Sequence, residues 1–211
     1  MKINEIFLSI QGEGILTGLP TIFIRTAGCN LRCSWCDTKF AYYQGKEASI
    51  KSVIKKIKKY KVKRVCITGG EPLSQEKEVI GLIKKLLKFK YDVSIETNGS
   101  LDIKKIPKKV LISLDIKCPS SRMSDKMLYS NINLIRSKDQ IKFIIDDLVD
   151  YNFAKKIVKR YNLTKKTNVI FQPVLGTKFV KSLIKNILKD KLDIKFSLQL
   201  HKVIWGNKRG V

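Results

Sequence analysis

The chain has 211 residues, of which 44% are hydrophobic, which suffices for one globular domain with a single core. No apolar run approaches the ~20 residues of a membrane-spanning helix, and no charged-apolar leader opens the chain, so we expect a cytoplasmic protein outside membranes. The net charge of +25 could indicate a protein that binds nucleic acid. However, only seven of the 43 basic residues are arginine, the residue that binds phosphates and base edges best, and the lysines are spread along the chain. We therefore expect a lysine-rich, solvated surface with no direct nucleic-acid partner.

The hydrophobic pattern predicts strands that alternate with helices in chain order. Alternation of this kind is typical of an α/β fold with a mostly parallel sheet. There are too few helices for eight βα units, so a partial, open TIM-like barrel fits better than a closed one. The predicted strands cover residues 2–10, 21–26, 62–68, 91–96, 109–115, 140–145, 168–173 and 194–200; helices cover 48–60, 76–89, 150–161 and 178–189, and a helix or lid covers 123–139.

Three cysteines, Cys29, Cys33 and Cys36, follow one another at C-x3-C-x2-C spacing. Thiolates this close can hold an iron-sulfur cluster, and three ligands for a cluster that takes four leave one iron open to bind a small molecule. Zinc sites usually have a second Cys or His pair, whereas Cys66 and Cys118 each stand alone here. Five cysteines without a leader also argue against disulfides. The spacing therefore predicts an iron-sulfur site with Cys66 and Cys118 outside it, and Cys66, inside a predicted strand, is expected to be buried.

The string Cys-Asn-Leu-Arg-Cys-Ser-Trp-Cys-Asp-Thr over residues 29–38, preceded by Gln-Gly-Glu-Gly at 11–14, resembles the 7-carboxy-7-deazaguanine synthases of the queuosine pathway. These are radical S-adenosylmethionine (SAM) enzymes. The resemblance implies an abbreviated barrel, a [4Fe-4S] cluster on the three cysteines, SAM at the open iron, and Mg²⁺ held by Thr38. It also implies a homodimer, an electron donor such as flavodoxin or ferredoxin, and 6-carboxy-tetrahydropterin as substrate, whose ring contracts with loss of ammonia.

Two segments could contact a substrate. The loop at 11–14 could place Glu13 against the amino groups of a heterocycle, or it could be a simple turn. Arg25, in a buried strand, could bind a substrate carboxylate or form a structural ion pair. The resemblance favours the substrate in both cases. It implies substrate contacts by Ile10, Gln11, Gly12, Glu13, Arg25, Thr68 and His201, and by the Val211 carboxylate.

The run Gly-Gly-Glu-Pro at 69–72 comes at the end of a predicted strand, where parallel α/β folds bind ligands. Glu71 and backbone carbonyls there could hold an ammonium group, and the resemblance makes this the methionine amino group of SAM. Phe143 could pack on adenine or be a plain core aromatic, and Glu96 and Asn98 could touch SAM or serve capping and turn roles. The predicted cofactor-binding residues are Trp35, Cys36, Asp37, Gly69, Gly70, Glu71, Asp115, Lys117, Lys142, Phe143, Ile144 and Ile145.

The sequence thus predicts a single radical SAM domain over residues 1–211, with a cluster loop at 29–38 and a substrate-contacting segment at 196–211. The C-x3-C-x2-C run alone leaves two alternatives open. One is an activating enzyme that installs a glycyl radical on a partner protein. The other is a non-catalytic metal module that binds RNA through its lysines. The loop at 11–14 and Arg25 favour a small-molecule synthase.

Overall fold

A curved sheet organises the molecule. Within residues 1–174 and 176–211, which the computed structural model describes, nine strands form one sheet in the order β3-β1-β2-β4-β5-β6-β7-β8-β9. β1 pairs antiparallel with β2 and β3, and every pair from β2 through β9 is parallel. The strands are β1 Lys2–Ile10, β2 Pro20–Thr26, β3 Lys46–Glu47, β4 Arg64–Gly69, β5 Asp92–Thr97, β6 Leu111–Ile116, β7 Gln140–Ile145, β8 Asn168–Pro173 and β9 Lys195–Phe196.

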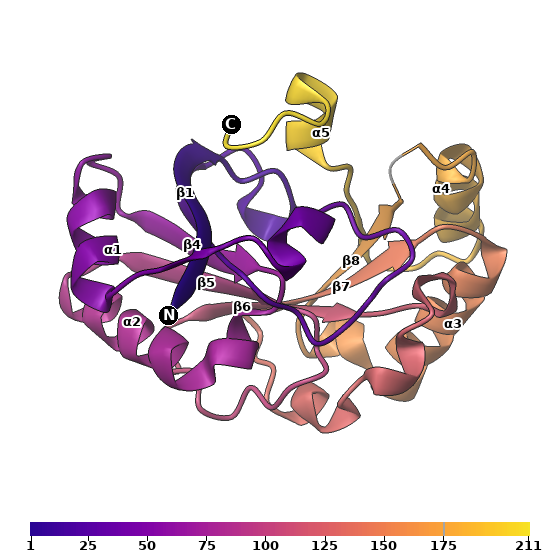
Figure 1. Cartoon of the computed structure of the whole chain (residues 1–211). Coiled ribbons are helices and arrows are strands. Elements are labelled where there is room, and N and C mark those ends of the chain that lie inside the picture. Colours follow the sequence, from indigo (N-terminus) through magenta and orange to yellow (C-terminus); the bar gives the residue numbers. More distant parts are fainter. Residues whose placement is uncertain (175) are drawn as a thin grey trace.

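Helices α1 to α4 cover the outer side of this sheet, while the C-terminal helix α5 lies beyond its opposite side (Figure 1). The outer helices bury one apolar stripe each, as Val53 and Ile57 of α1 show. Side-chain caps fix two helix starts: Ser49 accepts a hydrogen bond from the Ser52 amide, and Asp147 accepts one from the Asp150 amide. No described helix is both long and apolar enough to cross a bilayer. The helices are α1 Ile50–Lys58, α2 Glu76–Lys88, α3 Leu148–Arg160, α4 Val180–Lys189 and α5 Leu200–Trp205.

The sheet does not close on itself, because β3 and β9 are its two edges. The mostly parallel, open barrel that the alternating pattern predicts is therefore confirmed. Because β2 and β4 to β8 run parallel, their C-terminal ends meet at one rim. This rim is where an open α/β barrel presents its functional groups.

Two predicted elements need correction: for residues 123–139 the helix, one of the two alternatives, is wrong, and the last strand is shorter than predicted. Residues 123–139 form no α-helix but two short 3-10 turns, Ser124–Lys126 and Tyr129–Asn133. The reason is buried Asn131, whose side chain bonds the backbone of Leu101 and Ile103, so the segment is held as a loop.

The last strand is also shorter than predicted. Only Lys195–Phe196 pairs with β8, and the chain enters α5 at Leu200. The Leu200 amide donates to the Gly12 carbonyl at 2.9 Å, which turns the chain away from the sheet and over the rim.

Candidate active site

A cavity of about 420 Å³ opens at the C-terminal rim of the sheet. It receives side chains from β2, β4, β5, β6, β7 and β8, from the cysteine loop, and from the C-terminal segment. The structure thus brings together most residues that the sequence singled out. Those that line the cavity are Ile10, Gln11, Gly12, Glu13, Arg25, Cys29, Cys33, Trp35, Cys36, Asp37, Thr38, Thr68, Gly69, Gly70, Asp115, Lys117, Lys142, Ile144, His201 and Val211.

The three cysteines share one side of this cavity. Burial raises the pKa of the Cys29 and Cys33 thiols. In the described part of the chain, no three His, Cys, Asp or Glu side chains converge on a site for a single ion. Each thiolate of an iron-sulfur cluster binds its own iron, so its sulfurs need not meet at one point. The donor set and its placement therefore fit a [4Fe-4S] cluster.

The strand end at Gly69 and Gly70 packs directly on the start of the cysteine loop. A Cβ on Gly70 would lie 2.1 Å from the Gly28 carbonyl oxygen and 2.9 Å from the Cys29 Cβ, so no side chain fits there. The Glu71 amide donates to the same carbonyl at 2.8 Å. The two glycines thus keep their backbone exposed to the cavity next to the first cysteine.

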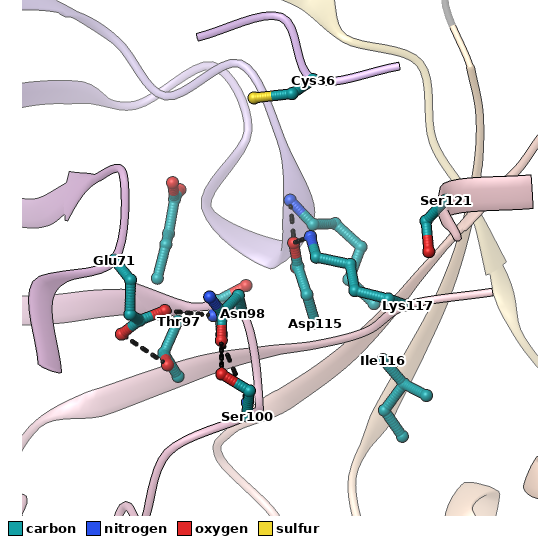
Figure 2. A network of polar contacts seen from close by, with 12 residues as sticks. Cys36, Glu71, Thr97, Asn98, Ser100, Asp115, Ile116, Lys117 and Ser121 are labelled. Atoms are coloured by element: carbon teal, nitrogen blue, oxygen red, sulfur yellow. Dashed lines mark hydrogen bonds and ion pairs between the residues drawn. The ribbon is translucent and has the colours of Figure 1, made fainter. Parts of the chain in front are cut away.

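The Glu71 carboxylate bonds groups inside the protein and does not line the cavity, so its predicted contact with SAM stays a prediction. Its carboxylate is fully buried and accepts hydrogen bonds from the Leu73 amide, the Thr97 hydroxyl and the Asn98 amide at 2.9, 2.9 and 2.6 Å (Figure 2). Burial raises the pKa of Glu71 to about 7, although these donors act in the opposite direction. Glu71 therefore joins the ends of β4 and β5 beneath the cysteine loop.

Asn98, for which the sequence left a SAM contact and a turn role open, also holds the cysteine loop. Asn98 donates to the Cys29 sulfur at 3.8 Å and to the Asn30 side chain at 3.0 Å, while its own oxygen accepts from Ser100 (Figure 2). Asn98 thus serves both the turn and the loop. Asn-Gly at 98–99 marked the turn in the sequence, but nothing local indicated a contact with the distant cysteine.

On its far side, the loop rests on the segment after β6. The Trp35 indole donates to the Ser120 hydroxyl at 3.0 Å, and the Ser34 amide donates to the Ser121 carbonyl at 3.1 Å. Buried Asp150 of α3 in turn accepts from the Ser120 amide at 2.9 Å. The loop is therefore supported on two sides by hydrogen bonds to the rim.

Two buried lysines and two carboxylates form a charge network inside the cavity. Lys117 bonds Asp115 at 2.7 Å (Figure 2), while Lys142 bonds Glu13 and lies 3.5 Å from Asp115. Burial acts to raise the pKa of Glu13, but the Lys142 ammonium and hydrogen bonds from Lys142 and Gln199 outweigh it and lower that pKa. Burial acts to lower the pKa of Lys142, and Asp115 and Glu13 raise it. The network therefore stays charged inside the protein.

Strand β7 alternates between cavity and core, which bears on two of the residues assigned to the cofactor. Lys142 and Ile144 line the cavity, whereas Phe143 and Ile145 are fully buried on the helix side. The Phe143 ring packs edge-on against Phe171, with ring centroids 5.5 Å apart. Phe143 and Ile145 are therefore core residues, and their side chains do not reach a cofactor in the cavity.

Gln172 of β8 is a cavity residue that the sequence reading missed. Its side chain lines the cavity, and its buried Oε1 has no hydrogen-bond partner among the described residues. Because side chains alternate along a strand, Gln172 lies on the same face as Ile170, and the residues of the opposite face are apolar. A polar residue on the face of Ile170 was the only signal in the sequence. Cys66 and Cys118 are fully buried outside the cavity, as predicted.

Arg25 of β2 forms the structural ion pair that the sequence left open and also faces the cavity. Its Nε donates to Glu5 at 2.8 Å in a partly buried ion pair. The guanidinium also lines the cavity, near the rings of Phe7 and Phe40. Within residues 1–174 and 176–211 its two terminal nitrogens have no hydrogen-bond acceptor, so they can pair with a carboxylate that enters the cavity.

The C-terminal segment covers the cavity. Gln199 donates to Glu13 at 2.7 Å, and Lys202 lies 3.5 Å from Asp37 of the cysteine loop. Farther along, the Arg209 guanidinium lies 3.6 Å from the centre of the Phe40 ring. Figure 1 shows this segment, in yellow, returning toward β1. The segment therefore connects the loop at 11–14 with the cysteine loop.

Comparison with known proteins agrees with this geometry. The model of the radical SAM superfamily matches residues 23–168. A 7-carboxy-7-deazaguanine synthase from Thermoplasma acidophilum is 37% identical, with 100% of both chains covered. Another from Methanospirillum hungatei is 42% identical over 97% of this chain and 85% of its own. This chain belongs to the 7-carboxy-7-deazaguanine synthase family of the radical SAM superfamily.

The crystal structure of QueE from Escherichia coli has the same fold, with a TM-score of 0.79 at 24% identity over 95% of this chain and 94% of that chain. Membership of the 7-carboxy-7-deazaguanine synthases decides against the two alternatives, a glycyl-radical activating enzyme and an RNA-binding module. Membership of the radical SAM superfamily implies a [4Fe-4S] cluster and SAM, for which the cavity supplies three thiols and the exposed backbone of two glycines.

Proposed function

We propose that this chain converts 6-carboxy-5,6,7,8-tetrahydropterin to 7-carboxy-7-deazaguanine and ammonia, a step of queuosine biosynthesis. The observation that carries this proposal is one cavity that combines the three cysteines with Arg25 and the loop at 11–14, in a chain matched end to end by synthases of that name. Substrate and products balance atom for atom, so the reaction needs no net electrons and SAM can be regenerated.

When bound, the cluster and SAM supply a 5′-deoxyadenosyl radical that removes a hydrogen atom from the substrate. Cys29, Cys33 and Cys36 would hold the cluster, and the exposed backbone of Gly69 and Gly70 would accept the methionine ammonium group. The charged Asp115, Lys117 and Lys142 side chains would orient the rest of SAM, together with Trp35, Asp37 and Ile144. The covering C-terminal segment limits access of water.

For the substrate, Arg25 would bind the carboxylate through its two free terminal nitrogens. Glu13, held ionised by Lys142, would accept hydrogen bonds from the pterin amino groups, with Gln11 and Thr68 beside it. His201 and the Val211 carboxylate would contact the substrate from the C-terminal side, while Ile10 and Gly12 supply the surface between them.

Several features of the whole protein belong to the same proposal. Residues 1–211 would act as one radical SAM domain, with the cluster loop at 29–38 and the substrate segment at 196–211. Mg²⁺ would sit at Thr38, whose hydroxyl lines the cavity, and would take further oxygens from water and substrate. The net charge of +25 suits an acidic reductant such as flavodoxin or ferredoxin. A cytoplasmic homodimer would have α4, with exposed Ile184 and Leu188, available for contact.

Anaerobic reconstitution with iron and sulfide tests the function. With SAM, dithionite and the tetrahydropterin, we expect stoichiometric 7-carboxy-7-deazaguanine and ammonia, measured by mass spectrometry. Cys33→Ala should abolish turnover, because one cluster ligand is lost. The Arg25→Ala protein should keep its iron. Its kcat/KM should fall at least ~100-fold, because two hydrogen bonds from the charged guanidinium to the substrate carboxylate are lost. SAM cleavage without a deazapurine product would contradict the proposal.

A further inference from the structure

A carboxylate with no role so far lies in the wall of the cavity. Glu96, near the end of β5, is partly buried and lines the cavity. Its two oxygens have different partners: Oε1 accepts from the Gln11 Nε2 at 3.1 Å, and Oε2 accepts from the Thr68 hydroxyl at 2.8 Å. Glu96 thus joins two cavity side chains that come from β4 and from the loop after β1.

We infer that Glu96 is a positioning residue that makes the Gln11–Thr68 wall accept hydrogen bonds, so that this wall selects a ligand edge made of N–H groups. An ionised carboxylate accepts hydrogen bonds and donates none. The single hydroxyl hydrogen of Thr68 is therefore committed to Glu96, and the lone pairs of its oxygen are left for a ligand.

The same carboxylate decides which way the Gln11 amide faces. Its nitrogen must point toward Glu96, and that nitrogen also lies 3.7 Å from the Cys66 sulfur, so both of its hydrogens face protein atoms. The amide oxygen then accepts from the Glu13 amide at 3.3 Å and keeps a lone pair. With the Glu13 carboxylate beside it, the whole wall presents acceptors.

This inference rests on the proposed function and names what the wall recognises there. The pyrimidine half of a pterin carries a 2-amino group and a ring N–H, which are donors that such a wall can bind. In an analogue with a carbonyl in place of the 2-amino group, the carbonyl oxygen is a hydrogen-bond acceptor and would face the acceptor atoms of the wall. A site built for one hydrogen-bond pattern rejects the opposite pattern strongly, because its own buried groups stay unpaired.

The test compares two stable ligands on reconstituted protein with SAM, by fluorescence titration. The ligands are pterin-6-carboxylate and lumazine-6-carboxylate, which has the 2-carbonyl. We expect the native protein to prefer the pterin by ~100-fold. In Glu96→Gln, the amide can donate to Thr68 and can accept from or donate to Gln11, so the wall loses its fixed polarity. The preference should then fall by at least ~10-fold. Glu78→Gln, an exposed residue of α2, is the matched control and should keep the native preference.

The ratio of the two affinities separates positioning from a structural role. Equal weakening of both ligands in Glu96→Gln, or an unchanged ratio, would overturn the inference even if the synthase activity is present. A native protein that binds the two ligands equally would also overturn it. A native protein that binds neither ligand and makes no deazapurine would overturn the proposed function, and the inference with it.

Discussion

Glu71 is a buried acid whose carboxylate is bonded entirely to groups of the protein. Its carboxylate lies under the cysteine loop and accepts hydrogen bonds from Leu73, in the turn after β4, and from Thr97 and Asn98 at the end of β5. Burial nevertheless raises its pKa to about 7, so near neutral pH the folded protein holds a proton there that the unfolded chain releases. Folding stability is therefore linked to this single proton.

The linkage predicts how stability varies with pH. Between pH 4.5 and about 7, the folded state keeps the Glu71 proton and the unfolded chain does not, so this group makes the free energy of unfolding fall as pH rises. The free energy of unfolding falls by about 3 kcal/mol over this range, and the fall ends above pH 7. Urea unfolding of the metal-free protein over this pH range, compared with Glu71→Gln, measures it.

Glutamine does not titrate, so Glu71→Gln removes the dependence of stability on this proton, although it also changes the hydrogen bonds at this position. The free energy difference between the two proteins should therefore change with pH in favour of the variant as pH rises. If the free energies of unfolding of the two proteins changed with pH in parallel, the pKa of Glu71 would be the same in the folded and unfolded states, contrary to this prediction.

The chemical role of a residue could be predicted from the sequence better than the side toward which its side chain points. The cysteine spacing, Arg25 and the loop at 11–14 were assigned to a shared pocket, and the structure places them around one cavity. Phe143 was open between cofactor and core, and Glu71 was assigned to SAM, yet both face away. Which side of a strand or turn faces a cavity depends on register with neighbouring strands, and short motifs do not encode it.

At the scale of elements, the buried strands were predicted closely because they carry continuous apolar runs between turns. β7 and β8 have the predicted bounds. The helix predicted as one alternative for 123–139 is wrong, because the segment is held as a loop by the buried side chain of Asn131, which bonds the backbone of residues 101 and 103. The two-residue strands β3 and β9 depend on pairing with β1 and β8, which local sequence does not specify.

The C-terminal helix α5 packs against the loop at 11–14 at Gly12, where that loop has no side chain. A Cβ on Gly12 would lie 2.0 Å from the His201 Nδ1 and 2.8 Å from its Cγ. Gly12→Ala should therefore displace the ring and weaken pterin-6-carboxylate binding at least ~10-fold. In a His201→Ala background, where the ring is absent, Gly12→Ala should change the affinity by less than ~2-fold, as measured by the same titration.

This double-mutant cycle has a clear opposite outcome. Equal losses in both backgrounds would mean that Gly12 acts through its own backbone and that α5 does not press on the loop. Thermal unfolding of all four proteins checks that each is folded.

For the molecule as a whole, the excess of 43 basic over 18 acidic residues is a source of self-repulsion. Salt screens such repulsion, since the Debye length falls from ~30 Å at 0.01 M to ~10 Å at 0.1 M. We expect the thermal unfolding midpoint to rise by about 3 °C or more between 10 and 300 mM NaCl, roughly 1 kcal/mol for a chain of this size. KCl should act alike, because screening is not ion-specific. A midpoint that falls with salt would show that attractive charge pairs dominate.

The cavity is built from opposite parts of the chain, and this has a consequence during synthesis. The cysteines leave the ribosome early, whereas residues 199–211, which lie across the rim, follow on the order of ten seconds or more later. Strands β4 to β8 are synthesised within that interval, so the sheet rim without its cover exists only in the last part of it, after Pro173. We expect iron and sulfide to reach the cysteines more easily in a chain that ends before residue 199 than in the full chain.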